Sequence, residues 1–335
     1  MRMGSASSSG GVGSKGDLGP HVLLPSKGGN MTTDRSGVIR FHERACPVCG
    51  LGVASKEVWP AKLNPASLGG FAYASRKEPD SMHLRMVECS GCRIMYATPA
   101  PTPDDLARLY RSAAFDGGEA GEAAARTYAK LVEANGALLP SRDGVLDIGT
   151  GTGAFLEEVL TRGWTRVRGI EPSEAPVAAA RSGVRHLILE DIFRPGMFGA
   201  ELFVLVTCFM TLEHVPDPMA LSMAVRELLV PGGAFMVVVH NRRATLNRLL
   251  GTRSPIIDVE HLQLFCSESL RALLEGAGYR DVSIAPITNA YPLSYWARLL
   301  PLPRAVRAVV LGSLGRLGHV ELGARVGNMV GIGKR

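Results

Sequence analysis

Short apolar runs alternate with stretches of helical period over the second half of the chain. The apolar runs predict strands at 144–149, 167–171, 186–190, 202–208 and 234–240. The stretches between them predict helices at 154–162, 174–182 and 218–229. A helix at 267–277, capped by Ser267, and two late strands at 281–285 and 328–333 follow. Regular alternation of this kind is typical of a doubly wound parallel sheet, so we expect an α/β domain over residues 141–335.

The first 140 residues follow a different pattern. Residues 1–38 are rich in Gly and Ser with few apolar anchors, which predicts a disordered leader in which Met31 offers an alternative start. Residues 39–100 hold three runs that we expect as short strands of a small lobe, at 53–58, 69–74 and 83–88. Thr102 is a good N-cap for a helix that ends near residue 112. A second helix at 123–139 completes a helical linker over residues 101–140.

A glycine turn joins the first strand of the α/β domain to its first helix. It reads Asp147-Ile-Gly149-Thr-Gly151-Thr-Gly153. Glycines let the backbone turn sharply and approach a ligand, and the helix N-terminus that follows attracts negative charge. Glu171 ends the next strand, where a carboxylate can accept hydrogen bonds from both hydroxyls of a ribose. The turn also fits a nicotinamide or flavin site through its G-x-G-x-x-A spacing, or a purely structural role.

The turn and Glu171 resemble motif I and its acidic partner in class I S-adenosylmethionine (SAM) methyltransferases, in which an acidic residue such as Asp147 precedes the glycines. The resemblance implies a Rossmann-like sheet of seven strands, with the late strands forming an added antiparallel pair. After the third strand, the Asp191 carboxylate could accept the adenine amino group while the Ile192 amide faces the ring. Alternatively, Asp191 caps a helix before Pro195.

Residues 212–218 read Leu-Glu-His-Val-Pro-Asp-Pro and resemble the LEHLPDP segment that ends strand four in a large branch of these enzymes. The resemblance places Cys208 to Met210 beside the methionine part of SAM, with Cys208 as a cofactor-binding candidate. The branch usually has an Asp near the start of this strand, whereas this chain has Phe203 and Val204. Glu213 and His214 stand at the centre of the segment, as site residues or as caps that orient the loop.

Residues 258–265 resemble the EHLxxFS segment of the same branch. In sugar C-methyltransferases, a Tyr-x-Glu-His version supplies the base. Here Glu260 and His261 match, and Asp258 replaces the tyrosine. We expect His261 to act as general base, oriented by the Glu260 carboxylate, with His214 as a third catalytic candidate. A loop-anchoring role is the alternative for this segment.

Four of the six cysteines form two C-x-x-C pairs, Cys46/Cys49 and Cys89/Cys92. Two such turns can place four thiolates around one tetrahedral site, which predicts structural zinc in a zinc-ribbon-like lobe. Free buried thiols and a redox role are the alternatives. We expect His83, between the pairs, at the surface rather than among the ligands. Tyr96 and Tyr110 are expected to pack at the boundary of the lobe.

Charge and hydropathy limit the kinds of binding partner and the compartment that we expect. The net charge is +6, but no run of four Lys or Arg occurs, which argues against a nucleic-acid partner. Residues 291–325 interleave arginines with apolar residues at helical spacing, which predicts a dimer face, a cover for the substrate pocket, or a peripheral membrane contact. The C-x-x-C pairs, the lack of a long apolar span and an N-terminus without a secretory core predict a cytoplasmic protein.

Together these motifs resemble zinc-lobed methyltransferases of polysaccharide, sugar and secondary-metabolite pathways, over about residues 46–334. The resemblance implies SAM-dependent methylation of a small molecule, at the oxygen rather than the carbon of a sugar or secondary metabolite. One alternative is an RNA methyltransferase that grips its substrate with the lobe. The other is a SAM-binding or zinc-binding partner protein without catalysis.

Overall fold

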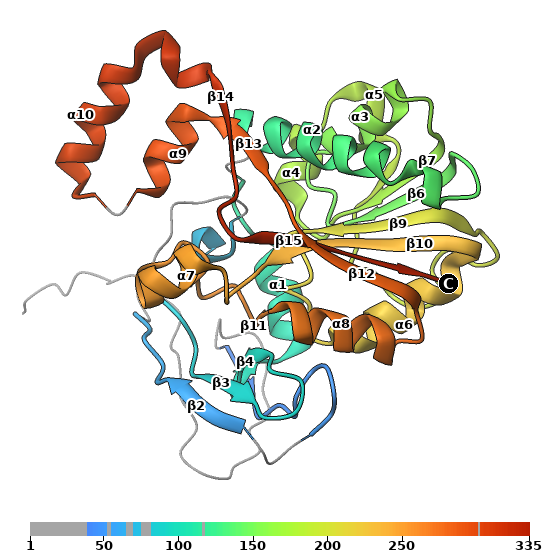
Figure 1. The fold of residues 1–335 in the computed structure, drawn as a ribbon, viewed down its shortest axis with the longest axis horizontal. Helices are drawn as coiled ribbons and strands as arrows, with labels where there is room; N and C mark the ends of the chain where they lie inside the picture. Colours follow the sequence, from blue (N-terminus) through green and yellow to red (C-terminus); the bar gives the residue numbers. More distant parts are fainter. Residues whose placement is uncertain (1–38, 52–54, 65–69, 75–81, 116–117, 301) are drawn as a thin grey trace, which may run out of the picture.

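The computed structural model describes residues 39–51, 55–64, 70–74, 82–115, 118–300 and 302–335. An α/β domain occupies most of this range, and a small lobe lies below it in the view of Figure 1. The expected leader, with Met31, falls outside the described residues.

The α/β domain is built on a seven-stranded sheet of order β12-β15-β10-β9-β6-β7-β8. Its strands are β6 (Asp143–Ile148), β7 (Thr165–Ile170), β8 (Ile188–Leu189), β9 (Phe203–Phe209), β10 (Leu229–His240), β12 (Arg280–Pro286) and β15 (Asn328–Lys334). Strands β6 to β10 are parallel, and β15 is antiparallel to both β10 and β12. All seven residues of β9 are buried, as expected for a central strand covered on both faces. The fold class and the late antiparallel pair are therefore confirmed.

Helices cover both faces of the sheet (Figure 1). One layer contains α2 (Gly118–Ala134), α3 (Ala154–Thr161), α4 (Glu174–Ala179) and α5 (Ser182–Arg185). The other contains α6 (Pro218–Leu228) and α8 (Ser267–Gly276). Apolar side chains of α2 and α3 pack in one hydrophobic cluster with the sheet, and those of α6 and α8 in another. The sheet therefore separates two cores.

Several expected boundaries were wrong. The helix expected at 123–139 begins earlier, at Gly118, and ends at Ala134 before a short 3-10 helix, η3 (Gly136–Leu138). The helix expected at 174–182 ends at Ala179 because Ala180 is extended, and α5 then leaves β8 only two residues. Helix α8 starts where expected, but Cys266 rather than Ser267 is its N-cap.

The lobe has a four-stranded antiparallel sheet of order β11-β4-β3-β2. Its strands are β2 (Ser55–Trp59), β3 (Met86–Cys89), β4 (Met95–Ala97) and β11 (Gln263–Leu264). The short strands β1 (Phe41–His42) and β5 (Ala100–Pro101) pair beside it, and α1 (Pro103–Arg111) follows, capped by Thr102 as expected. β11 comes from the second half of the chain, so the lobe is not built from residues 39–100 alone.

Two expectations within the lobe were wrong. The strand expected at 69–74 is instead a 3-10 helix, η2 (Gly70–Tyr73), in the described part of that stretch. His83 is not at the surface: it is 5% exposed, its Nδ1 lies 3.0 Å from the Leu84 carbonyl oxygen, and its ring lies near Trp59. The strand expected at 53–58 corresponds to β2, although residues 53 and 54 lie outside the described ranges.

Residues 289–300 and 302–324 form a projecting unit, called the unit at 289–324 below (Figure 1). It consists of β13 (Asn289–Pro292), α9 (Leu293–Leu299), α10 (Arg304–Leu314), the 3-10 helix η5 (Gly315–His319) and β14 (Glu321–Ala324). β13 and β14 pair as an antiparallel hairpin that was not expected. Apolar side chains such as Val309 and Leu317 are exposed here, but contact with a membrane or a second copy stays a prediction. Among the described residues, no helix is long and apolar enough to span a bilayer.

Candidate active site

The glycine turn meets the neighbouring strand ends at the carboxyl edge of the sheet. All three of its glycines have positive φ angles, 78° at Gly149, 57° at Gly151 and 74° at Gly153. A Cβ at Gly149 would lie 2.2 Å from Thr211 Oγ1, whereas one at Gly151 would meet nothing within 4 Å. Gly153 instead packs at the start of α3, where a Cβ would contact Ile188. Gly151 is therefore the glycine of the turn that leaves room for a ligand.

Glu171 and Asp191 lie at the ends of the next two strands and line the same cavity. Glu171 is buried and accepts the Gly151 amide at 2.9 Å and the Ser173 amide at 3.0 Å. Burial raises the pKa of its carboxyl group. Asp191 accepts a hydrogen bond from the Ile192 amide at 2.7 Å. This amide therefore points at the Asp191 carboxylate, whereas the sequence analysis expected it to face the adenine ring. Arg194 forms an ion pair with the same carboxylate.

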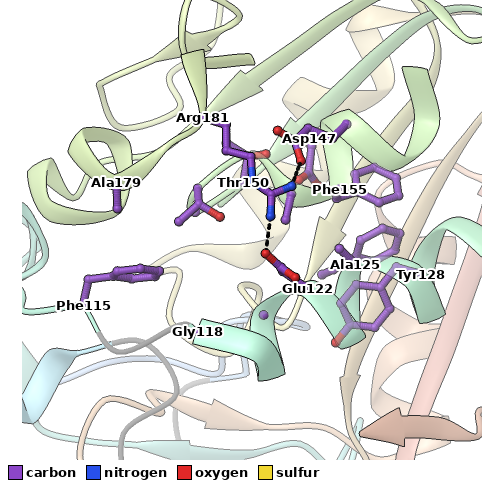
Figure 2. A pocket seen from close by; sticks show the side chains of 16 residues that line it. Phe115, Gly118, Glu122, Ala125, Tyr128, Asp147, Thr150, Phe155, Ala179 and Arg181 are labelled. Atoms are coloured by element: carbon purple, nitrogen blue, oxygen red, sulfur yellow. Dashed lines mark hydrogen bonds and ion pairs between the residues drawn. The ribbon is translucent and has the colours of Figure 1, made fainter. Parts of the chain in front are cut away.

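Asp147 lies under the glycine turn. It is buried, and Thr207 Oγ1 donates to its Oδ1 at 2.6 Å. Burial raises the pKa of this carboxyl group to about 7. Asp147 lines a smaller cavity of about 260 Å³, which Figure 2 shows together with Arg181 and Glu122. Arg181 forms ion pairs with Glu122 and Glu157 at its rim.

A cavity of about 1120 Å³ extends from the glycine turn to the far side of the site. Its walls are mostly apolar, and they come from the sheet edge, α1, α9 and the helix α7 (Thr245–Leu250), which was not expected. Beyond the glycine turn and the two acidic strand ends, the polar residues that line it include Tyr110, His214, His240, Asp258, Glu260, His261, Asn289 and Asn328. One cavity therefore joins five of the eight predicted cofactor residues to the predicted catalytic residues; the five are Gly149, Gly151, Glu171, Asp191 and Ile192.

The predicted catalytic residues come together. The His214 and His261 rings lie 4.8 Å apart, and His214 Nδ1 lies 3.9 Å from the Glu260 carboxylate. His261 Nδ1 donates to the Ile256 carbonyl oxygen at 2.8 Å, which leaves the lone pair on Nε2. The Glu260 carboxylate thus faces His214, and the partner observed for His261 Nδ1 is a carbonyl. The ligand atoms of these three residues lie within 4.8 Å of one another, a donor set that could also hold a divalent cation.

Three residues at this end were missed or underestimated by the sequence analysis. Tyr110 is more than a packing residue, because its hydroxyl lies 3.2 Å from His214 Nδ1 and donates to the Glu260 carbonyl at 3.2 Å. His240 Nδ1 donates to Asn328 Oδ1 at 2.8 Å, and burial lowers the pKa of His240 to about 4. His240 ends a predicted strand, so its position was the available signal. Asn328 likewise begins a predicted strand, and that position was its only signal.

Two other expectations are modified. Of the expected stretch 208–210, Phe209 and Met210 line the cavity. The Cys208 side chain does not: it is fully buried in the hydrophobic core, because side chains alternate along a strand and Cys208 takes the face opposite to Phe209. Glu213 is also fully buried and accepts the His240 amide at 2.7 Å, which is an orienting role. Burial raises the pKa of Glu213 to about 7.

The four cysteines of the lobe gather at one point. Cys46 Sγ lies 3.4 Å from Cys92 Sγ, and Cys49 Sγ lies 3.5 Å from Cys89 Sγ. All four sulfur atoms lie within 4.8 Å of one another, and the cysteines are not joined as disulfides. A tetrahedral zinc with Zn–S bonds of about 2.3 Å needs sulfur atoms at about this spacing. The donor set and its geometry therefore fit zinc.

Comparison with known proteins assigns the family. The family described as a methyltransferase domain matches residues 120–284. The ubiquinone biosynthesis O-methyltransferase of Stutzerimonas stutzeri is 32% identical over 168 residues, which are 45% of this chain and 72% of that protein. The chain belongs to the class I SAM-dependent methyltransferases. The resemblance seen in the sequence and the topology of the sheet agree with this assignment.

Other similarities of this methyltransferase are shorter or weaker. The ubiquinone biosynthesis O-methyltransferase of Pseudomonas syringae pv. tomato is 38% identical over 118 residues, which are 32% of this chain and 49% of that protein. The chain thus spans about half the length of this relative. One solved structure, a possible histamine N-methyltransferase from Thermotoga maritima, is 20% identical with a TM-score of 0.41, and the match covers 63% of this chain and 89% of that one.

Replacing Gly151 by alanine should weaken SAM binding at least about tenfold, because the new methyl group enters the cavity beside Glu171. Gly199→Ala is the matched control: Gly199 has a φ of 55°, also has open space around it, and lies on the exposed surface. Both variants should lose a similar stability of about 1 kcal/mol. Isothermal titration of SAM that gave both variants the same affinity would rule out Gly151 as a cofactor contact.

Asp147→Asn should gain stability over the wild type as the pH rises. The carboxyl pKa of Asp147 is about 7 in the folded state, above its ordinary value, so the wild type loses stability as the pH rises towards 7. Between about pH 5.5 and pH 8.5 the advantage of the variant should grow by about 2 kcal/mol in urea unfolding. Asp143→Asn, on the same strand with an exposed carboxylate whose pKa Arg166 lowers, should show no such trend. A constant difference at Asp147 would mean an ordinary pKa.

Proposed function

We propose that this methyltransferase transfers the methyl group of SAM to a hydroxyl oxygen of a small molecule bound in the large cavity. The observation that carries the proposal is the continuity of that cavity. It is lined at one end by Gly151, Glu171 and Asp191 and at the other by His214 and His261. An acceptor between the two ends would have a base on one side and the cofactor on the other.

The cofactor end of the cavity fits the group that the family uses. The open space at Gly151 admits close approach, and the Glu171 carboxylate beside it can still accept hydroxyl hydrogen bonds through its other lone pairs. Asp191 and Ile192 would hold the adenine from the next strand end. SAM supplies an activated methyl group, so the protein has to align the acceptor, exclude water and accept one proton.

His261 is the proposed base for that proton. Its Nδ1–H donates to the Ile256 carbonyl, which selects the tautomer with a basic Nε2. Glu260 and His214 lie beside it, where the carboxylate can stabilise positive charge on the imidazoles. His214 would then help to hold the acceptor hydroxyl, because it lines the same part of the cavity.

Oxygen is favoured over carbon as the methylated atom by the relatives, which are named O-methyltransferases. The mostly apolar walls of the cavity favour a secondary metabolite that carries a hydroxyl group over a bare sugar, and both over RNA, because a polyanion needs a basic groove. A protein that binds SAM without catalysis remains the alternative if no acceptor is methylated.

Replacing His261 by glutamine should lower kcat at least about a hundredfold, because general-base catalysis contributes that much. The dissociation constant of SAM should change less than about twofold, since Glu171 and Gly151 are untouched. His319→Gln is the control, because His319 is exposed and pairs only with the surface residue Glu119 among the contacts described. Methyl transfer from labelled SAM to a panel of phenols and sugar hydroxyls measures both. Unchanged turnover in the variant would remove His261 as the base.

We further propose that Cys46, Cys49, Cys89 and Cys92 bind one structural zinc. Four sulfur ligands leave no open position, so the metal would stabilise the lobe and take no part in the reaction. The spacing of the sulfur atoms and the absence of disulfides among these cysteines support this assignment.

Metal analysis should find about one zinc per chain. Cys89→Ser should lose it and unfold at a lower temperature, because one of the four ligands, itself fully buried, is removed. Cys266→Ser should keep the metal, because Cys266 is the N-cap of α8, where serine is well suited. Zinc retained at full occupancy in Cys89→Ser would argue against the four-cysteine site.

A further inference from the structure

The lobe contacts the acceptor side of the cavity through the two chain segments that carry the histidines. These histidine segments are residues 211–217, with His214, and residues 256–265, with Glu260 and His261. The second segment includes β11 near its end, and β11 pairs with β4 of the lobe at Gln263↔Tyr96 and Leu264↔Met95. The Ala97 amide also donates to the Leu262 carbonyl at 2.8 Å. The residues that follow His261 are thus a strand of the lobe sheet.

Arg44 extends this connection to both histidine segments at once. Its guanidinium donates to the Pro216 carbonyl at 2.7 Å and to Gln263 Oε1 at 3.0 Å. The same group lies 3.4 Å from the carbonyl oxygens of Ala97 and Leu262. Burial lowers the pKa of Arg44 to about 10, so the group stays charged at neutral pH. The guanidinium carries its N–H groups on separate nitrogens in a rigid fork and can bridge several acceptors, whereas a lysine carries its three donors on one nitrogen.

Gln263 completes the network. Its side chain is fully buried, and its Nε2 donates to the carbonyls of Leu212 and Val215, each at 2.8 Å. The Leu262 amide donates to the Glu213 carbonyl at 2.9 Å. Residues on both sides of His214 are therefore hydrogen-bonded to the segment of His261, and Arg44 holds that junction from the lobe.

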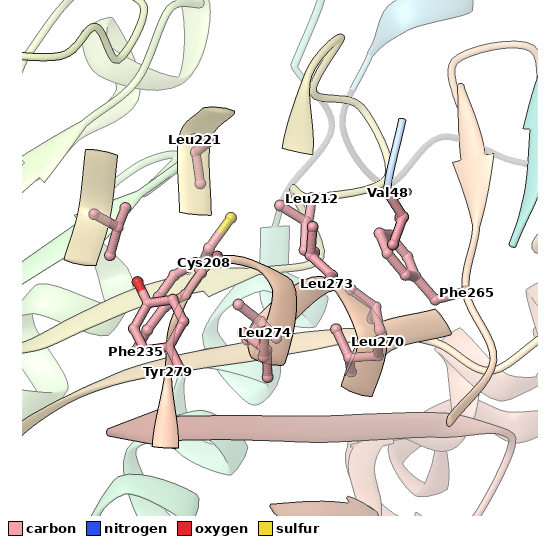
Figure 3. Packing of buried hydrophobic residues seen from close by; sticks show 14 of the residues in the cluster. Val48, Cys208, Leu212, Leu221, Phe235, Phe265, Leu270, Leu273, Leu274 and Tyr279 are labelled. Atoms are coloured by element: carbon pink, nitrogen blue, oxygen red, sulfur yellow. The ribbon is translucent and has the colours of Figure 1, made fainter. Parts of the chain in front are cut away.

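Apolar and aromatic contacts follow the same route. Val48 of the lobe belongs to the same buried cluster as Leu212 and Phe265 (Figure 3). Tyr73 of η2 packs edge-on against Tyr110 with ring centroids 5.6 Å apart, and both line the cavity. The Tyr110 hydroxyl reaches His214 and the Glu260 carbonyl. The lobe thus forms part of the acceptor-side wall.

The cofactor side is held differently. Glu171 is bound by the amides of Gly151 and Ser173, and Asp191 by the Ile192 amide and Arg194. These partners all belong to the α/β domain. We propose that the lobe, through Arg44, is the positioning element of the acceptor-side histidines and that Arg44 is a positioning residue for methyl transfer. This proposal rests on the proposed function, in which His261 accepts the proton.

Arg44→Lys in the full, zinc-loaded chain tests the proposal, with Arg85→Lys as matched control. Arg85 is also a lobe arginine, but it donates to Thr98 and Glu57 within the lobe. We expect Arg44→Lys to lower kcat at least about tenfold through displacement of the histidines. Its SAM affinity by isothermal titration should stay within about twofold of the wild type. Arg85→Lys should leave both quantities unchanged.

Imidazole titration by NMR provides a readout that needs no acceptor. Arg44→Lys should shift the titration curves or chemical shifts of His214 and His261, and Arg85→Lys should not. Tyr110→Phe, which keeps the ring and removes the hydroxyl, should perturb His214 in the same way if Arg44→Lys proves unstable. If SAM affinity fell in step with kcat, or if both lysine variants behaved alike, the lobe would have only a general structural role. Perturbed histidines together with a wild type that methylates no hydroxyl would support the positioning role and overturn the proposed function.

Discussion

A parallel sheet brings the carboxyl ends of its strands to one edge, and the rest of this structure depends on that constraint. Strands β6, β7 and β9 end side by side, so the glycine turn, Glu171 and Thr211 converge although they are distant in sequence. Everything else extends or encloses this edge. The lobe, α1, α7 and the unit at 289–324 provide the outer walls that turn an open edge into a cavity.

Enclosing the edge of the sheet changes the pKa values of the ionisable groups buried around the cavity. Asp147 and Glu213 are carboxyl groups in the interior, and burial raises the pKa of each to about 7. Buried hydrogen bonds are stronger than exposed ones, so Glu213 can hold the His240 backbone firmly through a single amide. The same surroundings lower the pKa of His240 to about 4 and so keep its ring neutral beside the proposed base. A neutral neighbour does not oppose protonation of His261.

Much of this architecture was predictable from the chain, because its patterns are local. The spacing of the glycines at 149–153 and of the apolar residues around them predicts a strand, a turn and a helix. The two C-x-x-C pairs predict a common metal site. Other features depend on contacts between distant segments. No pattern near Gln263 predicts that β11 pairs with β4 of the lobe rather than with a strand of the α/β domain. The strands β13 and β14 are separated by two helices, so their pairing and register could not be predicted from the local sequence. Cys208 was misplaced because a motif names a strand end and not the face that each side chain takes.

The insertion of β11 into the lobe also has a consequence for the order of assembly. Arg44 and Gln263 are 219 residues apart along the chain. During synthesis from the N-terminus, the lobe emerges early, yet the strand that completes its sheet emerges only after most of the α/β domain. Until then β4 has an open edge with unpaired backbone groups, which invites pairing with another chain. The lobe sheet can therefore be completed only once residues 263 and 264 have been made, which couples the last step of lobe assembly to the α/β domain.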